Sequence, residues 1–230
     1  MKKVAILQSN YIPWKGYFDM IAAVDEFIIY DDVQFTKNDW RNRNKIKTPN
    51  GVQWITIPVR QENLDQKISE TRVSDHRWAD KHWKTLKQNY SRAEGFLTFA
   101  PTLEKTYRQA AELEFLSDIN LLFLRTLCQL THIDTTISLC TDYSMKGDRM
   151  SRLVNLCAQA SATAYLSGPS GKSYLQEDEF TNSGIAVEWM DYSGYVEYPQ
   201  LHPPFDHHVS LIDLLFNSGP GSSSYMNSVS

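Results

Sequence analysis

The sequence predicts an α/β fold with a mainly parallel sheet and flanking helices. Short, mostly apolar runs alternate with amphipathic segments over most of the 230 residues, as is typical of parallel strands connected by helices. The 42% hydrophobic and 22% charged residues are the composition of a globular chain, and the length suits one substantial domain. We predict a single domain over residues 1–217 and a flexible tail over 218–230, where small polar residues dominate.

Six short runs predict the strands. Several are apolar almost throughout, as expected of strands that are covered on both faces. The runs are residues 4–8, 27–33, 53–59, 136–140, 164–166 and 186–190.

Helical periodicity is clearest in the middle of the chain. Trp78, His82, Leu86 and Tyr90 recur at four-residue spacing, and residues 102–130 predict two helices with a break near Ser117. We therefore expect a helical insertion around residues 76–130. Further on, Asp148 is the expected N-cap of another helix, and Gly219–Pro220 should end a short one that follows residue 207.

Composition excludes several classes of protein. No apolar run reaches eighteen residues and the N-terminal one is too short for a secretory signal, so we expect a cytoplasmic protein without membrane insertion. A net charge of −4 argues against a protein that coats DNA. The three cysteines lack C-x-x-C spacing and no G-x-G-x-x-G is present, so neither structural zinc nor a dinucleotide is expected.

The stretch AYLSGPSGKSYL, residues 164–175, contains Gly-Lys-Ser but not a P-loop. A P-loop needs a glycine five positions before its second glycine, and that position here is Leu166. The stretch predicts a strand, a tight turn and a helix starting near Lys172. An anion bound near Ser167, Ser170 and Lys172 is one interpretation, and a plain turn with a solvated lysine is the other.

The loop after the first strand carries polar and aromatic side chains suited to a nucleoside or a sugar. Its candidate ligand-binding residues are Gln8, Asn10, Tyr11, Trp14 and Tyr17.

Asp31 and Asp32 end the second strand and are followed by a basic segment. A carboxylate there can bind Mg²⁺, accept sugar hydroxyls or act as a base, although adjacent strand residues face opposite ways and Asp is also common in turns. Arg41, Asn42 and Arg43 suit phosphates and sugar hydroxyls, unless the segment is only a solvated basic loop.

Histidines cluster near the C-terminus. His207 and His208 are neighbours, which is poor geometry for one metal ion, so no metal site is expected. His202 is the more attractive candidate, as a ligand contact or a base.

These stretches together resemble the WbqC-like protein family. The matching pieces are QSNYIPWKGYFDMI, YDDVQFTKNDWRNRNKI, AYLSGPSGKSYL, YPQLH and SLIDLLFNSGP, which run from the first strand to about residue 220. The resemblance adds Gln34 to the candidate binding residues. The opening strand, loop, helix and strand also look like the start of nucleotidyltransferase-type folds, although their H-x-G-H pair is absent here.

The family resemblance implies a transferase of bacterial polysaccharide (O-antigen) biosynthesis that moves an aminoacyl group such as glycine to an amino sugar or nucleotide sugar. We expect Asp32 or His202 to accept a proton and Lys172 to hold phosphate or carboxylate. The activated acyl group would come from ATP with Mg²⁺, a thioester or an aminoacyl-tRNA. The alternatives are a non-catalytic module that binds a nucleotide sugar, and a nucleotidyltransferase or ATP-dependent amide ligase.

Overall fold

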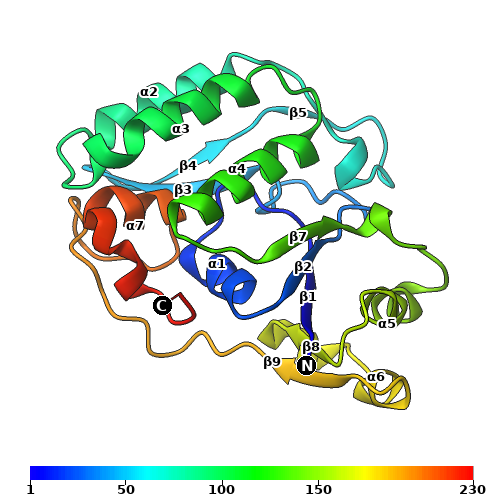
Figure 1. Cartoon of the computed structure of the whole chain (residues 1–230). Helices are drawn as coiled ribbons and strands as arrows, with labels where there is room; N and C mark the ends of the chain where they lie inside the picture. The colour runs from blue at the N-terminus through cyan, green and yellow to red at the C-terminus, as the bar shows by residue number, and fades with distance from the viewer. Residues whose placement is uncertain (230) are drawn as a thin grey trace.

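The protein is built around a five-stranded sheet in which all neighbouring strands are parallel, in the order β7-β2-β1-β8-β9. The computed structural model describes residues 1–229 (Figure 1). The strands are β1 (Lys3–Leu7), β2 (Glu26–Ile29), β7 (Thr136–Leu139), β8 (Ala164–Ser167) and β9 (Ala186–Trp189). The predicted α/β class is therefore confirmed.

The order of the strands reverses at β1. The chain passes from β1 to β2 and then to β7 on one side, and afterwards places β8 and β9 on the other side. In the register of the sheet, Leu7 pairs with Ile29 and Ala5 with Leu166. In open parallel sheets ligands bind outside the carboxyl ends of the strands, at the point where the order reverses. The ends of β1 and β8 therefore mark the region where a site is expected.

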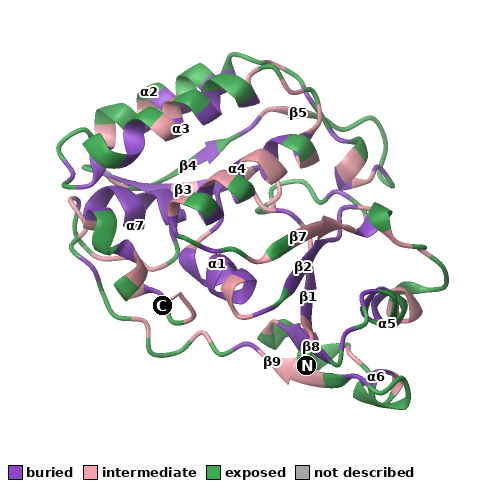
Figure 2. Ribbon diagram, viewed as in Figure 1, coloured by how far each residue is buried: buried purple, intermediate pink, exposed green. Residues whose placement is uncertain are grey.

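Two hydrophobic cores cover the two faces of the sheet. Ala5 and Ile29 belong to the larger core, which includes α1 (Lys15–Ala22) and α4 (Leu116–Leu130). Val4 and Ile6 belong to the smaller core, with residues of α5 (Arg149–Gln159) and α6 (Glu177–Asn182). The alternation of side chains along β1 explains the division, and Figure 2 shows both the strand and α1 as buried.

Three helices form the predicted insertion around residues 76–130. α2 (Trp78–Tyr90) and α3 (Phe96–Ala110) form an outer layer, and α4 lies between them and the sheet (Figure 1). The break between α3 and α4 covers residues 111–115, slightly before the predicted one, and no side chain caps α4.

One predicted strand lies outside the parallel sheet. Residues 53–59 fall on β4 (Gly51–Thr56), which pairs antiparallel with β3 (Arg43–Thr48), and on β5 (Val59–Arg60), which pairs with β6 (Arg72–Val73). The chain reverses through Pro49 and Asn50, and Gly51, the first residue of β4, has φ +96°, a left-handed conformation that glycine adopts readily after such a turn.

The helix ends agree in part with the sequence. Asp148 caps α5 by accepting a 2.9 Å hydrogen bond from the Ser151 N–H, as predicted. The helix expected near Lys172 is wrong: Pro169–Ser173 is a 3-10 turn, and α6 begins only at Glu177.

Most of the segment predicted as a flexible tail packs against the domain. α7 (Leu211–Ser218) ends before Gly219 as expected, but Gly219–Tyr225 continues as a 3-10 helix and Met226 is buried in the larger core. The buried Asp19 carboxylate accepts hydrogen bonds from the backbone N–H groups of Asn227, at 3.1 Å, and Ser228, at 2.7 Å.

Within residues 1–229, no helix has both the length and the apolar character needed to cross a lipid bilayer.

Candidate functional site at the carboxyl edge of the sheet

Asp31 ties together the carboxyl ends of β1 and β2. Its carboxylate accepts hydrogen bonds from the Ser9 N–H, at 2.8 Å, and from the hydroxyls of Ser9 and Ser117, both at 2.7 Å. Ser9 and Asp31 each lie two residues beyond neighbouring parallel strands, so the two side chains meet at one edge. Asp31 is buried, and with three donors its carboxylate is satisfied inside the protein.

Arg41 extends this network over the end of β1. Its guanidinium donates to the Asn10 side-chain oxygen and to the Ser9 carbonyl, and lies 3.6 Å from Asp39. Asn120, on α4, donates to the Ser9 hydroxyl and to the Arg41 carbonyl, both at 2.9 Å. Three of the predicted binding residues, Asn10, Asp31 and Arg41, thus lie in one hydrogen-bond network, which also includes Ser9 and Asn120.

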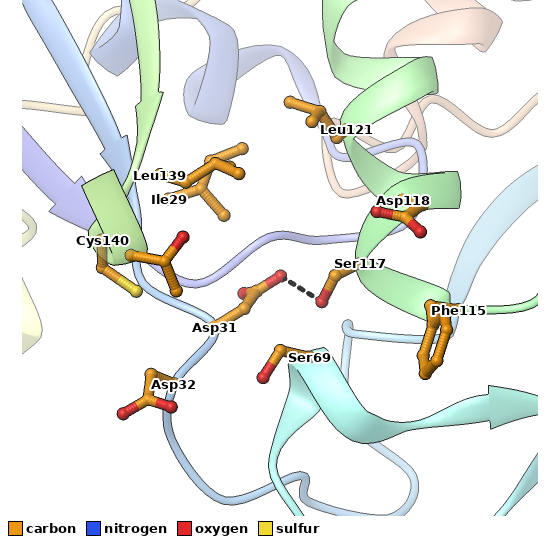
Figure 3. A pocket seen from close by; sticks show the side chains of 11 residues that line it. Ile29, Asp31, Asp32, Ser69, Phe115, Ser117, Asp118, Leu121, Leu139 and Cys140 are labelled. Atoms are coloured by element: carbon orange, nitrogen blue, oxygen red, sulfur yellow. Dashed lines mark hydrogen bonds between the residues drawn. The ribbon is translucent and has the colours of Figure 1, made fainter.

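A cavity of about 200 Å³ opens beside Asp31 (Figure 3). The lining of this cavity combines carboxylates and hydroxyls with apolar side chains. Figure 3 shows Asp31 directed at Ser117 and Asp32 pointing away from it. The lining residues are Ile29, Asp31, Asp32, Ser69, Phe115, Ser117, Asp118, Leu121, Leu139, Cys140 and Thr141.

Asp32 is engaged by Lys67 in this cavity. The two form a partly exposed ion pair, and the hydrogen bond that Lys67 donates to the Asp32 carboxylate raises the pKa of Lys67. Cys140 is no ready nucleophile, because burial raises the pKa of its thiol and keeps it protonated at neutral pH. Of the side chains in the cavity, Asp32 is the one predicted as a proton acceptor from the sequence.

A second pocket, of about 240 Å³, lies between two indole rings. We call it the tryptophan pocket, and it is lined by Asn10, Pro13, Trp14, Trp40, Asn44 and His208. His208 stacks on Trp14 with ring centroids 5.9 Å apart, and Tyr192 supports the same indole at 5.2 Å. The pocket contains the predicted Asn10 and Trp14. Sequence reasoning did not select Trp40, Asn44 or His208, although the first two lie within the basic motif.

Two positively charged side chains of β3 lie beside Trp40 and Trp54, next to the tryptophan pocket. The Arg43 guanidinium lies 4.3 Å from the ring centroid of Trp54, which in turn packs 5.0 Å from Trp40. The Lys45 ammonium is 5.4 Å from Trp54 and 5.8 Å from Trp40. Trp40 and Trp54 are both more than a third exposed, so aromatic faces and positive charges are offered together to solvent.

A third cavity, of about 390 Å³, brings together the predicted Gln8 and Gln34 at the carboxyl ends of β1 and β2. The Gln34 amide donates to the Leu64 carbonyl at 2.6 Å.

Three of the predicted binding residues are turned into the protein. The Tyr11 hydroxyl is 2.9 Å from His82 Nδ1 and 2.8 Å from the Tyr107 hydroxyl, so its ring has no open face for a ligand. Tyr17 donates to the Gln8 carbonyl at 2.9 Å, and Asn42 donates to the Ile57 carbonyl at 2.9 Å. Burial raises the pKa of both tyrosines. These side chains shape the loops that carry the pockets rather than lining the tryptophan pocket.

The turn after β8 is closely packed. A Cβ on Gly171 would lie 2.5 Å from the Ser167 hydroxyl and 2.8 Å from the Trp189 ring, so only glycine fits. Ser167 is buried, whereas Ser170 and Lys172 are exposed. The Lys172 ammonium lies 5.6 Å from the Trp189 ring centroid and lines none of the cavities described above.

His202 does not join Asp32. Its ring is buried, and Nε2 is 2.9 Å from the carbonyl of Asn89 near the end of α2. The two residues predicted as alternative proton acceptors therefore have separate surroundings. The described residues, 1–229, contain no group of three His, Cys, Asp or Glu side chains arranged to hold a metal ion.

The protein thus has an α/β fold with several small cavities at the carboxyl edge of its parallel sheet. The profile of the WbqC-like protein family matches residues 8–225, and the chain belongs to that family. It is 49% identical over 227 residues to the uncharacterized protein Rv1507c of Mycobacterium tuberculosis, covering 98% of both chains. No solved structure matches the chain.

Proposed function

We propose that the protein is a transferase of bacterial polysaccharide biosynthesis that binds a nucleotide sugar and transfers an aminoacyl group, such as glycyl, to it. The observation that carries this proposal is the tryptophan pocket, which joins two indole faces to amide side chains next to the end of β1. Its volume of about 240 Å³ suits one ring rather than an extended ligand.

The chemistry of the pocket fits a sugar joined to phosphates. The C–H faces of a sugar ring, or the face of a base, can pack on Trp14 or Trp40, and Asn10 can hydrogen-bond to ring hydroxyls. Arg43 and Lys45 stand beside Trp40 and Trp54, where they can neutralise a diphosphate. This is the chemical pattern of a nucleotide-sugar ligand.

Transfer of an acyl group requires a proton acceptor and an activated carboxyl. Asp32 is the best placed of the predicted acceptors, because it lines a cavity at the carboxyl edge, while His202 is bonded to backbone and Lys172 lies elsewhere. In this proposal Asp32 takes the proton of the attacking amino or hydroxyl group as the acyl–nitrogen or acyl–oxygen bond forms. The bond between the acyl carbon and its carrier breaks as the new bond forms, so AMP leaves from an adenylate made from ATP with Mg²⁺, a thiol from a thioester, or the tRNA from an aminoacyl-tRNA.

Binding and transfer are tested separately. Calorimetry with a panel of uridine diphosphate sugars should give binding to the wild type and at least tenfold weaker binding to Trp40→Ala. The matched control is Leu97→Ala, which truncates an exposed apolar side chain on α3 that does not line the pocket. Radiolabelled glycine is then supplied with ATP and Mg²⁺, as a thioester or as glycyl-tRNA, together with candidate amino sugars. Absence of labelled sugar with every donor would reject glycyl transfer.

A non-catalytic module that binds a nucleotide sugar is the second candidate. It is favoured by the engagement of Asp32 with Lys67 and of His202 with Asn89, which leaves neither side chain free as a base. Asp32→Asn distinguishes the two functions. If the protein is a transferase, Asp32→Asn should lose turnover with little change in sugar binding. If it is a binding module, the variant should bind the sugar and support the activity of its partner enzyme as well as the wild type does.

A further inference from the structure

The third cavity lies where open parallel sheets bind their ligands. It is lined by Leu7 and Gln8 at the end of β1 and by Tyr165 on β8, which neighbours β1 on the side opposite β2. Its volume, about 390 Å³, exceeds that of the tryptophan pocket. Ile6, Tyr30 and Tyr165 belong to the smaller core, whereas Trp14 packs against the larger one, so the two pockets are on different faces of the sheet.

Arg149 gives this cavity a positive charge that the fold does not use. It forms no ion pair with the described residues, 1–229, and its guanidinium lies 4.7 Å from the ring centroid of Tyr174, which also lines the cavity. Stacking of this kind holds the planar group while its N–H donors stay available.

Arg152 adds a second positive charge close by. It lies near the Tyr30 hydroxyl, where it partly offsets the rise in pKa that burial causes. Both arginines are in the first two turns of α5, where positive charge is unfavourable next to the helix dipole. The helix dipole therefore does not explain their placement, although the Arg152 guanidinium donates to the Gly147 carbonyl at 2.9 Å.

The carboxylates near the cavity are already engaged. Asp32 also influences Tyr30, but it is paired with Lys67. Asp148 precedes Arg149, and its Oδ1 accepts hydrogen bonds from the N–H and hydroxyl of Ser151. The Arg149 guanidinium is thus left to interact with an anion from outside the chain.

Other residues that line the cavity can recognise a flat, polar group. The Gln8 side-chain amide makes no hydrogen bond to any of the described residues, 1–229, and the Gln34 side-chain oxygen is likewise open to a donor. Tyr30 and Leu153 add apolar surface to the lining of the same cavity. Amides beside an aromatic and apolar wall suit the edge and face of a nucleobase.

We infer that this cavity is a mononucleotide site in which Arg149 binds phosphate while Gln8 and Gln34 contact the base. The site is separate from the tryptophan pocket, and its occupancy by nucleotide does not depend on the proposed transfer. Use of that nucleotide to activate the acyl group does rest on the proposed function, and it would select ATP among the three donors.

The test measures binding of AMP, ATP and inorganic phosphate to the full chain by calorimetry. AMP and ATP should bind the wild type, and Arg149→Gln should weaken both by about tenfold or more. Arg149→Lys, which keeps the charge but not the planar fork, should give an intermediate affinity. Arg108→Gln, which removes an exposed helical arginine paired with Glu104, is the matched control and should change neither affinity.

Several results would overturn the inference. These are no binding of either nucleotide to the wild type, equal binding to Arg149→Gln, or equal affinity of inorganic phosphate and AMP, which would remove the role of the base. Trp40→Ala should leave ATP binding unchanged, and an equal loss in this variant would place the nucleotide in the tryptophan pocket instead. Failure of uridine diphosphate sugars to bind would reject the proposed function and leave the nucleotide result standing. Circular dichroism and thermal unfolding confirm that each variant is folded.

Discussion

The backbone N–H and the hydroxyl of Ser9 both donate to the Asp31 carboxylate, at 2.8 and 2.7 Å. This pair joins the ends of two adjacent parallel strands, and the Ser117 hydroxyl brings the start of α4 to the same point. The loops that form the pockets therefore start from an anchored position. Adjacent Asp32 faces the other way and pairs with Lys67, so two neighbouring carboxylates have different roles.

Replacement of Asp31 should destabilise the protein far more than replacement of Asp32. Asp31→Ala leaves the two buried Ser9 donors and the partly buried Ser117 hydroxyl without their acceptor, which should cost about 3 kcal/mol or more of unfolding free energy. Asp32→Ala removes one partly exposed ion pair and should cost at most about 1 kcal/mol. Urea denaturation of both variants measures the difference. Equal losses would mean that Asp31 does not anchor the edge.

Gly16→Ala should destabilise the protein, although alanine is the better helix former by about 1 kcal/mol. A Cβ at this position would lie 2.4 and 2.5 Å from two atoms of the Trp14 ring. That ring is held by Tyr192, Tyr195 and His208 and cannot move aside freely. We expect a net loss of about 1–3 kcal/mol from overpacking, with weaker binding in the tryptophan pocket.

Gly221→Ala is the control for this substitution. No atom lies within 4 Å of its would-be Cβ, so the unfolding free energy should change by no more than about 0.5 kcal/mol. If Gly16→Ala were as stable as the control, Trp14 would be more mobile than its contacts indicate.

Removal of residues 227–230 should lower stability by about 1–3 kcal/mol. The buried Asp19 carboxylate would lose the N–H groups of Asn227 and Ser228 and keep Tyr195 as a donor. Asn227→Ala keeps the backbone N–H and is the control, with an expected change below about 1 kcal/mol. Thermal and urea unfolding compare the two variants. If the truncated protein is as stable as the full chain, these residues do not contribute to stability.

His82 should make the protein sensitive to mild acid. Burial lowers the pKa of its ring from 6.5 to about 4, so the folded state takes up the proton only below the pH at which the unfolded chain does. Its contribution to stability is complete above pH 6.5 and is lost as the pH falls toward 4. The loss should approach roughly 2–3 kcal/mol.

Urea denaturation between pH 7.5 and 4.5 measures this dependence. His82→Gln keeps a polar partner for Tyr11 but cannot titrate, so its unfolding free energy should fall less steeply over that window. A slope identical to that of the wild type would assign the acid sensitivity to other groups.

Several elements of the fold were predictable because their signals are local. The apolar runs of β1, β2, β7, β8 and β9 lie within the predicted strands or within two residues of them. The periodicity of α2 and the Asp148 cap were likewise evident from residues a few positions apart. The hairpin of β3 and β4 was missed, since an apolar run does not reveal whether its partner is parallel or antiparallel.

The candidate site was less predictable, because contacts between distant segments decide which side chains face a pocket. Asn10 and Trp14 line the tryptophan pocket, but Tyr11, between them, is turned toward His82 and Tyr107. These partners lie 71 and 96 residues away, and nothing in the local motif shows which aromatic ring they will cover. Arg149 was missed for the same reason, since it reaches the cavity only when α5 packs beside β1 and β8.

Short-range patterns in the chain thus decided its α/β class, most of its strands and helices and its family motifs, because periodicity and capping act within a few residues. Tertiary structure alone decided that Asp31 is an anchor and Asp32 an ion-pair partner. It also brought His208 to Trp14 and separated His202 from the carboxyl edge. The physical reason is that burial and hydrogen-bond partners are properties of packed surfaces, and these surfaces exist only after the sheet and its helices have assembled.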